Sequence, residues 1–421
     1  MRRTNGVAGS VDLPPDKSIA HRSALFAAMG EGTSTVMNYP ASADPQSTLS
    51  CLRRLGIEIA EEDDALVVHG RGLGGFRAPD EPIDCGNSGT TMRLLAGMLA
   101  GRPFDSELVG DEFLNGRPME RIALPLREMG ARIHLTSGHA PIRIEGGSEL
   151  HGITYRLPIP SAQVKSCVLL AGLFAEGRTT VIEELPSRDH TERMLGLAVI
   201  EKNGERHILA EKDIAIEPRT WTVPRDFSAA AFFLVAGAAA PEGELHLPRV
   251  GLNPTRNALL HVLQAMGARI EVSNETNRGG EPIGDLTVRA SDLQGVRVDG
   301  ELIPVLIDEV PILAVAGALA EGRTEIRDAK ELRVKETDRI RAMVDNLRRM
   351  GASVEEFEDG LAVEGPAALE GAVVDSFHDH RIAMAMGVAG LMADGETVVE
   401  HASCAAVSFP DFWRTLDDVA L

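Results

Sequence analysis

The chain repeats one pattern six times, and this repetition constrains its fold more than any other feature. In each copy an Ala- and Leu-rich segment ends at a glycine, and these glycines follow one another at intervals of 66 to 79 residues: Gly32, Gly101, Gly177, Gly243, Gly322 and Gly395. A strand-like stretch, a second helical segment closing on motifs such as LRRLGI or LQAMGA, and further strands follow. The pattern predicts six units, each roughly βαβαββ, with the glycines as left-handed helix caps.

A unit of this kind cannot bury its apolar helix alone, so the units must pack on one another. An open solenoid would achieve this packing. However, the first helix of each unit is apolar nearly all round, as in FSAAAFFLVAGAAA from Phe227, which indicates enclosure by sheets. We therefore expect an α/β (α+β) protein with two lobes, each built from three repeats around buried helices. The N-terminal lobe is expected over 17–226, and the C-terminal lobe over 1–16 and 227–421, because the first strand precedes the crossing at PPDK.

Composition excludes several classes of protein. The net charge is −21, from 42 basic and 63 acidic residues, and only 4% of residues are aromatic, so a nucleic-acid partner is not expected. No apolar run reaches the ~18 residues of a membrane span, and the N-terminus carries no signal-peptide pattern. The four cysteines lie far apart without a CxxC pair, which favours a reducing compartment and no structural zinc. The expected location is the cytoplasm.

The openings of the six buried helices carry the polar residues: DKSIAHR, GNSGTTMR, PSAQVK, RDFS, DEVP and HDHR. Ser, Asn and Asp at such positions are ordinary N-caps. These openings also contain Lys17, Arg22, Gln163 and Arg381, which capping does not require. Helix N-termini attract anions through free N–H groups and the helix dipole. We therefore expect anion sites on both lobes, lining a cleft between them.

The segment LRVKETDRI places five charges within seven residues. A solvated helix face would explain it. Alternatively, Lys335 and Arg339 are four apart, so that on a helix both would point to one face and capture an anion, with Glu336 beside them for proton transfer.

Other catalytic patterns are weaker. Asn87-Ser88-Gly89-Thr90 could bind phosphate through backbone N–H groups but lacks the Lys of a Walker loop. The HDH sequence has no third cluster of metal ligands nearby, and no Gly-x-Ser-x-Gly elbow is present. Neither a metal nor a covalent intermediate is expected.

The motifs PPDKSIAHRS, GNSGTTMRLL, RPMERI, PSAQVKS, DEVPILA, LRVKETDR and DHRIAM together resemble the 3-phosphoshikimate 1-carboxyvinyltransferase (EPSP synthase) family. The resemblance covers essentially the whole chain, and SAQVK, RDHTE and NPTR are similar to its second sequence class. It implies an enolpyruvyl transferase fold with the active site in the interdomain cleft. It also implies a monomer without metal or organic cofactor, in the pathway to chorismate and the aromatic amino acids.

The implied reaction transfers the enolpyruvyl group of phosphoenolpyruvate to the 5-hydroxyl of shikimate 3-phosphate. It releases phosphate by addition and elimination through a tetrahedral intermediate. The herbicide glyphosate, which is longer than phosphoenolpyruvate, would occupy the same site.

The resemblance also implies the site residues. Those for shikimate 3-phosphate are Lys17, Ser18, Arg22, Ser161, Ala162, Gln163, Arg188, Asp308 and Lys335. Those for phosphoenolpyruvate are Lys17, Gly89, Arg117, Gln163, Arg339 and Arg381. The catalytic residues are Asp308 as base on the 5-hydroxyl, Glu336 as acid at the methylene carbon, Lys17 touching both substrates and Lys335 at the hydroxyl. Surrounding cations oppose protonation of Glu336, so its acid role requires either burial or a passing proton to offset them.

Two positions depart from the family pattern, and two alternatives remain. Val407 stands where some members have a Lys, and Glu331 replaces an Asn that some use toward the shikimate phosphate. A sister enzyme acting on UDP-N-acetylglucosamine has Lys-Asn where this chain has Lys17-Ser18, and a cysteine where this chain reads LNGRPM. A phosphoanion-binding repeat scaffold without catalysis is the other alternative.

Overall fold

The computed structural model describes residues 1–212 and 214–421, and these divide into two compact units. We refer to Pro15–Pro224 together with Asn277–Glu281 as the N-unit. We refer to Met1–Pro14, Arg225–Thr276 and Pro282–Leu421 as the C-unit. The sequence predicts changes of lobe at 16/17 and 226/227, two residues after the observed ones, and does not predict the separate assignment of 277–281.

The N-unit contains three four-stranded sheets, with strand orders β13-β2-β4-β3, β5-β6-β8-β7 and β9-β10-β12-β11. Its strands are β2 (Glu31–Met37), β3 (Glu58–Glu62), β4 (Ala65–Arg71), β5 (Ile83–Asp84), β6 (Ser106–Val109), β7 (Arg132–Thr136), β8 (His139–Glu145), β9 (Thr154–Arg156), β10 (Thr179–Glu183), β11 (Val199–Lys202), β12 (Glu205–Ala210) and β13 (Thr220–Thr222). Its helices are α1 (Lys17–Met29), α2 (Ala43–Arg54), α3 (Gly89–Leu99), α4 (Glu112–Asn115), α5 (Glu120–Glu128), α6 (Ala162–Gly172) and α7 (His190–Leu195).

The C-unit contains two four-stranded sheets, β1-β14-β16-β15 and β17-β18-β20-β19, and the two-stranded sheet β21-β22. Its strands are β1 (Val7–Ser10), β14 (Gly243–Gly251), β15 (Arg269–Arg278), β16 (Glu281–Arg289), β17 (Arg297–Val298), β18 (Gly322–Ile326), β19 (Ser353–Phe357), β20 (Gly360–Gly365), β21 (Val373–Asp375) and β22 (Val398–Glu400). Its helices are α8 (Phe227–Ala239), α9 (Ala258–Ala265), α10 (Ile303–Leu306), α11 (Val310–Leu319), α12 (Arg339–Arg349), α13 (His380–Met392) and α14 (Phe412–Val419), with short 3₁₀ turns η1 (Gly300–Leu302), η2 (Lys330–Val334) and η3 (Ala402–Val407).

Five of the six repeats share one topology. The first strand pairs in parallel with the second, and a closing hairpin adds the other two strands, as in β9-β10-β12-β11. The first repeat takes its parallel strand from β13, at the end of the N-unit segment, and the fourth takes its strand from β1, which pairs with β14. The sixth repeat differs from the prediction, because β21 and β22 form a two-stranded sheet and, in the described part of the chain, no hairpin follows α14, which stands at the position of the second helix.

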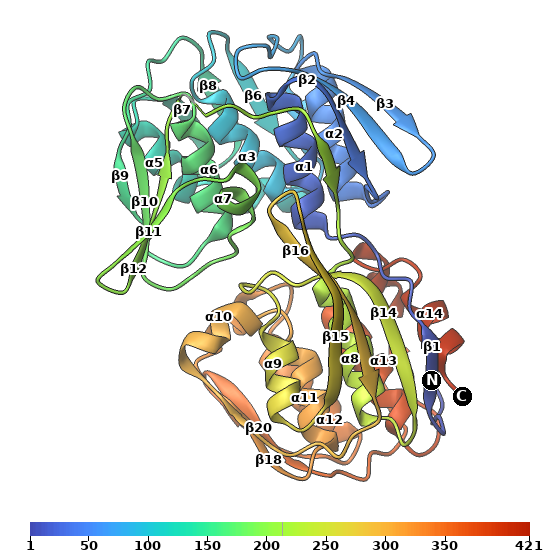
Figure 1. Ribbon diagram of the computed structural model, residues 1–421. Coiled ribbons are helices and arrows are strands. Elements are labelled where there is room, and N and C mark those ends of the chain that lie inside the picture. Colours follow the sequence, from blue (N-terminus) through green and yellow to red (C-terminus); the bar gives the residue numbers. More distant parts are fainter. Residues whose placement is uncertain (213) are drawn as a thin grey trace. The chain divides into compact units, whose positions relative to one another are not determined.

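The first helix of each repeat forms the core. In Figure 1, α1, α3 and α6 lie between the β2–β4 sheet and the β10–β12 sheet of the N-unit. In the C-unit α8, α11 and α13 contact one another pairwise. Nearly every residue of α8 is buried, which confirms that an apolar helix without a polar face is enclosed by sheets.

The repeat glycines are not helix caps as predicted. Gly243 and Gly322 open strands β14 and β18, with φ of 116° and 90°, after helices whose C-caps are Ala240 and Ala320. The left-handed backbone that favours glycine is present, but it serves the turn into the next strand.

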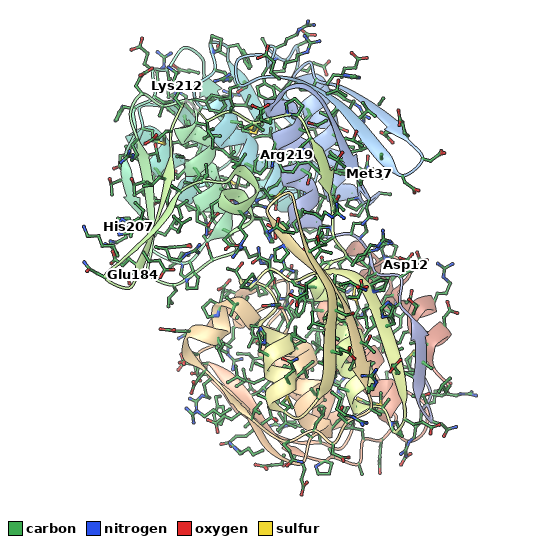
Figure 2. The ribbon with its side chains drawn as sticks, viewed as in Figure 1. Asp12, Met37, Glu184, His207, Lys212 and Arg219 are labelled. Atoms are coloured by element: carbon green, nitrogen blue, oxygen red, sulfur yellow. The ribbon has the colours of Figure 1, made fainter. Side chains whose placement is uncertain are left out.

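An ion pair joins two segments beside the first strand of the C-unit. Asp12, which follows β1 and is labelled in Figure 2, lies 2.6 Å from Nη2 of Arg225, just before α8. No single helix in the described part of the chain is long and apolar enough to cross a membrane, although Gly300–Leu306 and Val310–Leu319 pass that test together as a pair bent by 111°.

Candidate functional site

The predicted residues of the N-unit lie at the N-terminal ends of its buried helices. Asp16 caps α1 by accepting from the Ile19 N–H (2.9 Å). Ser88 caps α3, accepting from the Thr91 N–H at 3.2 Å, and Ser161 caps α6. Each cap leaves further N–H groups of the first turn without an intrahelical partner, which suits an anion.

Helix α1 carries three of the predicted residues within two turns. Lys17 and Ser18 are its first two residues, and the Lys17 Nζ lies 3.6 Å from the Asp44 carboxylate. Arg22 lies one turn later and donates from Nη1 to the Ser18 carbonyl oxygen at 3.0 Å. Arg22 is only 3% exposed, and burial lowers its pKa to about 10, so it remains a cation at neutral pH.

Gly89 and Arg117 come together at the start of α3. A Cβ on Gly89 would lie 3.2 Å from Arg117 Nη1 and 3.0 Å from Arg93 Nη1. Arg117 donates to the Asn87 Oδ1 at 2.8 Å, and the Asn87 Nδ2 donates to the Asp111 carboxylate at 2.7 Å. Asp111 therefore fixes the orientation of the amide that holds Arg117.

Gln163 is held by side chains of α3. Its Nε2 donates to the Thr90 hydroxyl at 3.0 Å, and its Oε1 accepts from Arg93. Burial lowers the pKa of Arg93 to about 10. Ala162 opens α6, while Arg188 precedes α7 and is a repulsive neighbour of Arg22. The structure thus brings Arg188 to the same end of the N-unit as Arg22.

In the C-unit, Asp308 lies between two of the predicted arginines. Its two carboxylate oxygens are 3.5 Å from Arg339 Nη1 and 3.5 Å from Arg381 Nη2. Arg381 also donates to the Asp308 carbonyl oxygen at 2.8 Å. The side chain of Asp308 is 18% exposed, so it is shielded but reachable from solvent.

The prediction that Lys335 and Arg339 share one helix face is wrong. Helix α12 begins only at Arg339, because the Asp338 side chain caps it by accepting from the Arg341 N–H (3.0 Å). Lys335 lies before the helix in extended backbone, with its Nζ 2.6 Å from the Glu331 carboxylate. The two cations are therefore placed by different local structures.

Glu336 is partly exposed and lies beside Arg339. Its side chain is 53% exposed, and Oε2 accepts from Arg339 Nη2 at 2.7 Å.

Sequence reasoning missed two buried acids. Asp379 caps α13 with one oxygen, accepting from the Arg381 N–H (2.8 Å), and accepts from Arg339 Nε with the other (2.8 Å). Glu309 is 3.4 Å from Arg381 Nη1, and burial raises the pKa of its carboxyl against the opposing effect of Arg381. The DHR and DEVP motifs contain these residues, but nothing in the letters distinguishes an acid that orients arginines from an ordinary cap.

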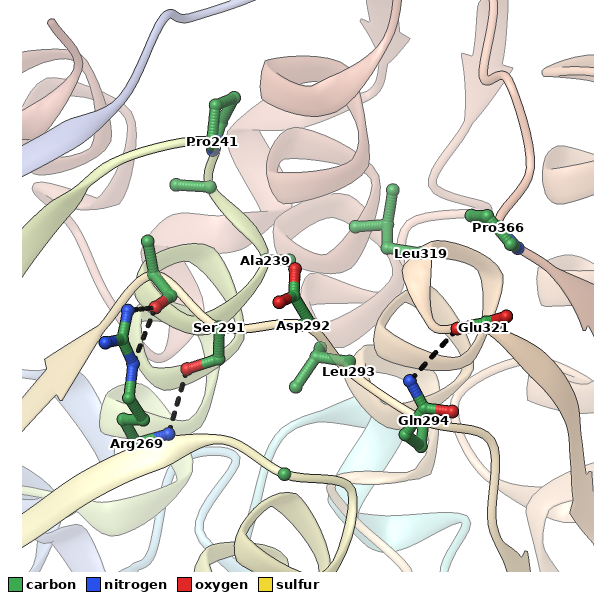
Figure 3. Close-up of a pocket in the computed structure, with 13 residues that line it drawn as sticks. Ala239, Pro241, Arg269, Ser291, Asp292, Leu293, Gln294, Leu319, Glu321 and Pro366 are labelled. Atoms are coloured by element: carbon green, nitrogen blue, oxygen red, sulfur yellow. Dashed lines mark hydrogen bonds between the residues drawn. The ribbon is translucent and has the colours of Figure 1, made fainter.

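A cavity of the C-unit lies elsewhere. It has a volume of about 1030 Å³ and is lined by Ala239 and Leu319, the last residues of α8 and α11, together with Arg269 and Asp292 (Figure 3). Asp308 precedes the N-terminus of α11. The length of that helix, roughly 15 Å at 1.5 Å per residue, separates this end from the cavity at Leu319. Among the described residues, no three His, Cys, Asp or Glu side chains are grouped to hold a metal ion.

Comparison with known proteins gives a consistent result. Residues 1–416 match the family model described as EPSP synthase (3-phosphoshikimate 1-carboxyvinyltransferase). The chain is 63% identical over 417 residues to the 3-phosphoshikimate 1-carboxyvinyltransferase of Salinibacter ruber, covering 98% of this chain and 97% of that one. It is 49% identical to the protein of the same name from Solibacter usitatus, with 98% and 97% coverage.

Solved structures agree. The EPSP synthase of Acinetobacter baumannii superposes with a TM-score of 0.93 at 42% identity, covering 100% of this chain and 97% of that chain. The enolpyruvyl transferase NikO from Streptomyces tendae superposes with a TM-score of 0.78 at 18% identity, with 100% and 96% coverage, which shows the fold alone.

Proposed function

The chain belongs to the EPSP synthase (3-phosphoshikimate 1-carboxyvinyltransferase) family, and from this premise we propose how its residues divide the work of the reaction. It is an enzyme that transfers the enolpyruvyl group of phosphoenolpyruvate to shikimate 3-phosphate in the shikimate pathway. The fold is the two-lobed enolpyruvyl transferase fold.

The N-unit residues bind shikimate 3-phosphate. Arg22, Lys17 and Arg188 supply positive charge for its phosphate and carboxylate. Ser18, Ser161, Ala162 and Gln163 supply hydrogen bonds from the first turns of α1 and α6. The support is that these groups gather at helix N-termini, where free N–H groups add to the side-chain donors.

Six residues are assigned to phosphoenolpyruvate. Arg339 and Arg381 of the C-unit are planar forks suited to its carboxylate and phosphate. Arg117 and Lys17 add cations from the N-unit, Gln163 adds an amide, and Gly89 allows close approach. With Val407 in place of a lysine, these arginines carry more of the binding.

Asp308 is the base that takes the proton of the 5-hydroxyl. The observation that carries this assignment is its carboxylate, 3.5 Å from each of the two arginines assigned to phosphoenolpyruvate and 18% exposed. The deprotonated oxygen attacks C2 of phosphoenolpyruvate while the methylene carbon gains a proton, which gives the tetrahedral intermediate. Phosphate then leaves as a proton is lost from the methyl carbon.

Lys335 contacts the hydroxyl, and its charge favours the developing alkoxide. Glu336 is the acid for the methylene carbon. In the observed arrangement Glu336 pairs with Arg339. Proton donation therefore requires Glu336 to leave that pair and to be protonated when phosphoenolpyruvate binds.

The deciding experiment measures phosphate release from phosphoenolpyruvate with and without shikimate 3-phosphate. Release only with both substrates is expected. UDP-N-acetylglucosamine in place of shikimate 3-phosphate tests the sister activity and should give none. Binding of shikimate 3-phosphate without turnover would instead identify a phosphoanion-binding scaffold.

The enzyme acts as a monomer in the cytoplasm. Cys51, Cys85, Cys167 and Cys404 are all free thiols, which suits a reducing compartment. Sedimentation at several protein concentrations tests the monomer, and a self-association constant in the low micromolar range would contradict it.

A further inference from the structure

Two hydroxyl groups hold one edge of Arg22. Its Nε donates to the Thr191 Oγ1 at 2.8 Å, and its Nη2 donates to the Ser166 Oγ at 2.7 Å. The two hydroxyl oxygens are themselves 2.8 Å apart. Thr191 belongs to α7 and Ser166 to α6, and neither side chain is exposed. Three elements of the N-unit thus fix the plane of one guanidinium.

The hydroxyl pair occupies the place where a carboxylate usually stands. A carboxylate would accept both N–H groups and cancel the charge of the arginine. Two neutral hydroxyls accept the same two N–H groups and leave the charge intact. A guanidinium has five N–H groups, and with Ser18 three are used, so one on Nη1 and one on Nη2 remain for a ligand.

The acidic residues near Arg22 each have another partner. Glu192, Glu281 and Asp16 raise the pKa of Arg22, against the larger effect of burial, so they lie in its neighbourhood. Asp16 caps α1 by accepting from the Ile19 N–H. Glu192 is 2.7 Å from the Nζ of Lys165, and Glu281 is 2.8 Å from His190 Nδ1. Among the described residues, no carboxylate lies within ion-pair distance of Arg22.

The Lys165 partner of Glu192 has a further acidic neighbour. Lys165 is fully buried, and its Nζ also lies 3.0 Å from Glu183, which in turn accepts from Arg206 at 2.8 Å. The residue next to Lys165 on α6 is Ser166, and the residue next to Glu192 on α7 is Thr191. The buried Lys165–Glu192 ion pair therefore joins the two helices at the point where their hydroxyls meet Arg22.

We propose that Ser166 and Thr191 are positioning residues that aim the Arg22 guanidinium at shikimate 3-phosphate and, because they are neutral, leave its charge for that anion. The inference rests on the proposed function. It assigns part of the affinity for one substrate to two hydroxyls held on α6 and α7.

The first test removes the hydroxyl but keeps the shape. Thr191→Val is expected to raise the KM and the calorimetric Kd for shikimate 3-phosphate by about tenfold, since one hydrogen bond to a charged group is lost. The kcat and the KM for phosphoenolpyruvate should stay within about twofold. Thr191→Ser keeps the hydroxyl and should restore the wild-type values, and Ser166→Ala should repeat the effect of Thr191→Val from the other helix.

The second test separates orientation from charge. Thr191→Asp retains an acceptor for Arg22 Nε but adds a carboxylate, which would pair with the guanidinium. We expect thermal stability at or above wild type, yet a KM for shikimate 3-phosphate raised at least as much as in Thr191→Val. If Thr191 served stability alone, the Thr191→Asp variant would bind shikimate 3-phosphate with the wild-type KM.

Thr179→Val is the matched control. Thr179 is a fully buried threonine of the N-unit whose hydroxyl has no hydrogen-bond partner, so its removal should leave every constant unchanged. If the wild type releases phosphate but Thr191→Val, Ser166→Ala and Thr191→Asp all keep its KM and Kd for shikimate 3-phosphate, this inference is overturned and the proposed function stands. If the wild type itself neither binds shikimate 3-phosphate nor releases phosphate, the proposed function fails first.

Discussion

A single methyl group at Gly89 tests how closely the arginines of the N-unit are packed. The Cβ of Gly89→Ala would lie 3.0 Å from Arg93 Nη1 and 3.2 Å from Arg117 Nη1, whereas ordinary contact begins at 3.4 Å. Arg93 must therefore retreat by about 0.4 Å and Arg117 by about 0.2 Å. Both are flexible ends of long side chains, so the protein can accommodate the change.

The expected cost falls on binding and spares stability. Gly89 is the first residue of α3 and has a negative φ, where Ala is favoured over Gly by ~0.5–1 kcal/mol, and this gain offsets the local crowding. We expect the free energy of unfolding to change by less than about 1 kcal/mol. A misplacement of about 1 Å can cost roughly 100-fold in rate, so a shift of a few tenths of an ångström predicts a rise of about 3- to 10-fold in the KM for phosphoenolpyruvate.

The assay is phosphate release at saturating shikimate 3-phosphate, with phosphoenolpyruvate varied and glyphosate as competitor. The inhibition constant of glyphosate should rise by a larger factor than the KM, because the longer ligand reaches nearer to the methyl group. Gly116→Ala is the matched control. A Cβ there meets nothing nearer than 3.6 Å, although the residue precedes Arg117 in the chain. An unchanged KM in Gly89→Ala, or an equal rise in Gly116→Ala, would refute the steric argument.

Three further perturbations follow from the structure. Asp308→Asn should lower kcat at least about 100-fold while shikimate 3-phosphate still binds in calorimetry, since the shape survives without the base; near-normal turnover would remove Asp308 from this role. Asp379→Asn cannot accept from both the Arg381 N–H and Arg339 Nε, so it should raise the KM for phosphoenolpyruvate and lower the melting temperature; an unaltered KM would contradict that arrangement. Burial lowers the pKa of His21 to about 3, so the unfolded chain binds one more proton than the folded one between about pH 3 and 6.5. The free energy of unfolding should fall as pH decreases through that window, by up to about 1.4 kcal/mol per pH unit. Urea unfolding at several pH values should show a weaker pH dependence of this free energy in His21→Gln than in wild type; an equal dependence would contradict the assignment.

Much of the fold could be predicted from the order of the letters, because repetition and patterning act locally. A helix such as α8, apolar on all sides, has to be enclosed, and a strand pattern followed by a hairpin recurs at regular intervals. The same is true of the helix N-termini, since Asp and Ser are favoured N-cap residues and Asp16, Ser88 and Ser161 cap their helices. The truncated sixth repeat was not predicted, because α14 is amphipathic and resembles the second helices of the other repeats.

The candidate site could be predicted as a set of charges but not as an arrangement. Spacing alone placed Lys335 and Arg339 on one helix face, whereas the cap formed by Asp338 starts the helix after Lys335. The exposure of Glu336 is likewise a tertiary property: its side chain is half exposed beside Arg339, and its role as the acid stays a prediction.

The sequence by itself determined the family, the repeat and the residue types available for chemistry, because these depend on identity and order along the chain. Only the tertiary structure decided which charges meet. Asp379 reaches Arg339 across 40 residues of sequence, and Thr191 reaches Arg22 across 169. Such pairs form only when separate repeats pack side by side. The buried acids that hold the arginines, and the hydroxyls that leave Arg22 charged, are therefore consequences of packing between repeats of one unit, which no local pattern encodes.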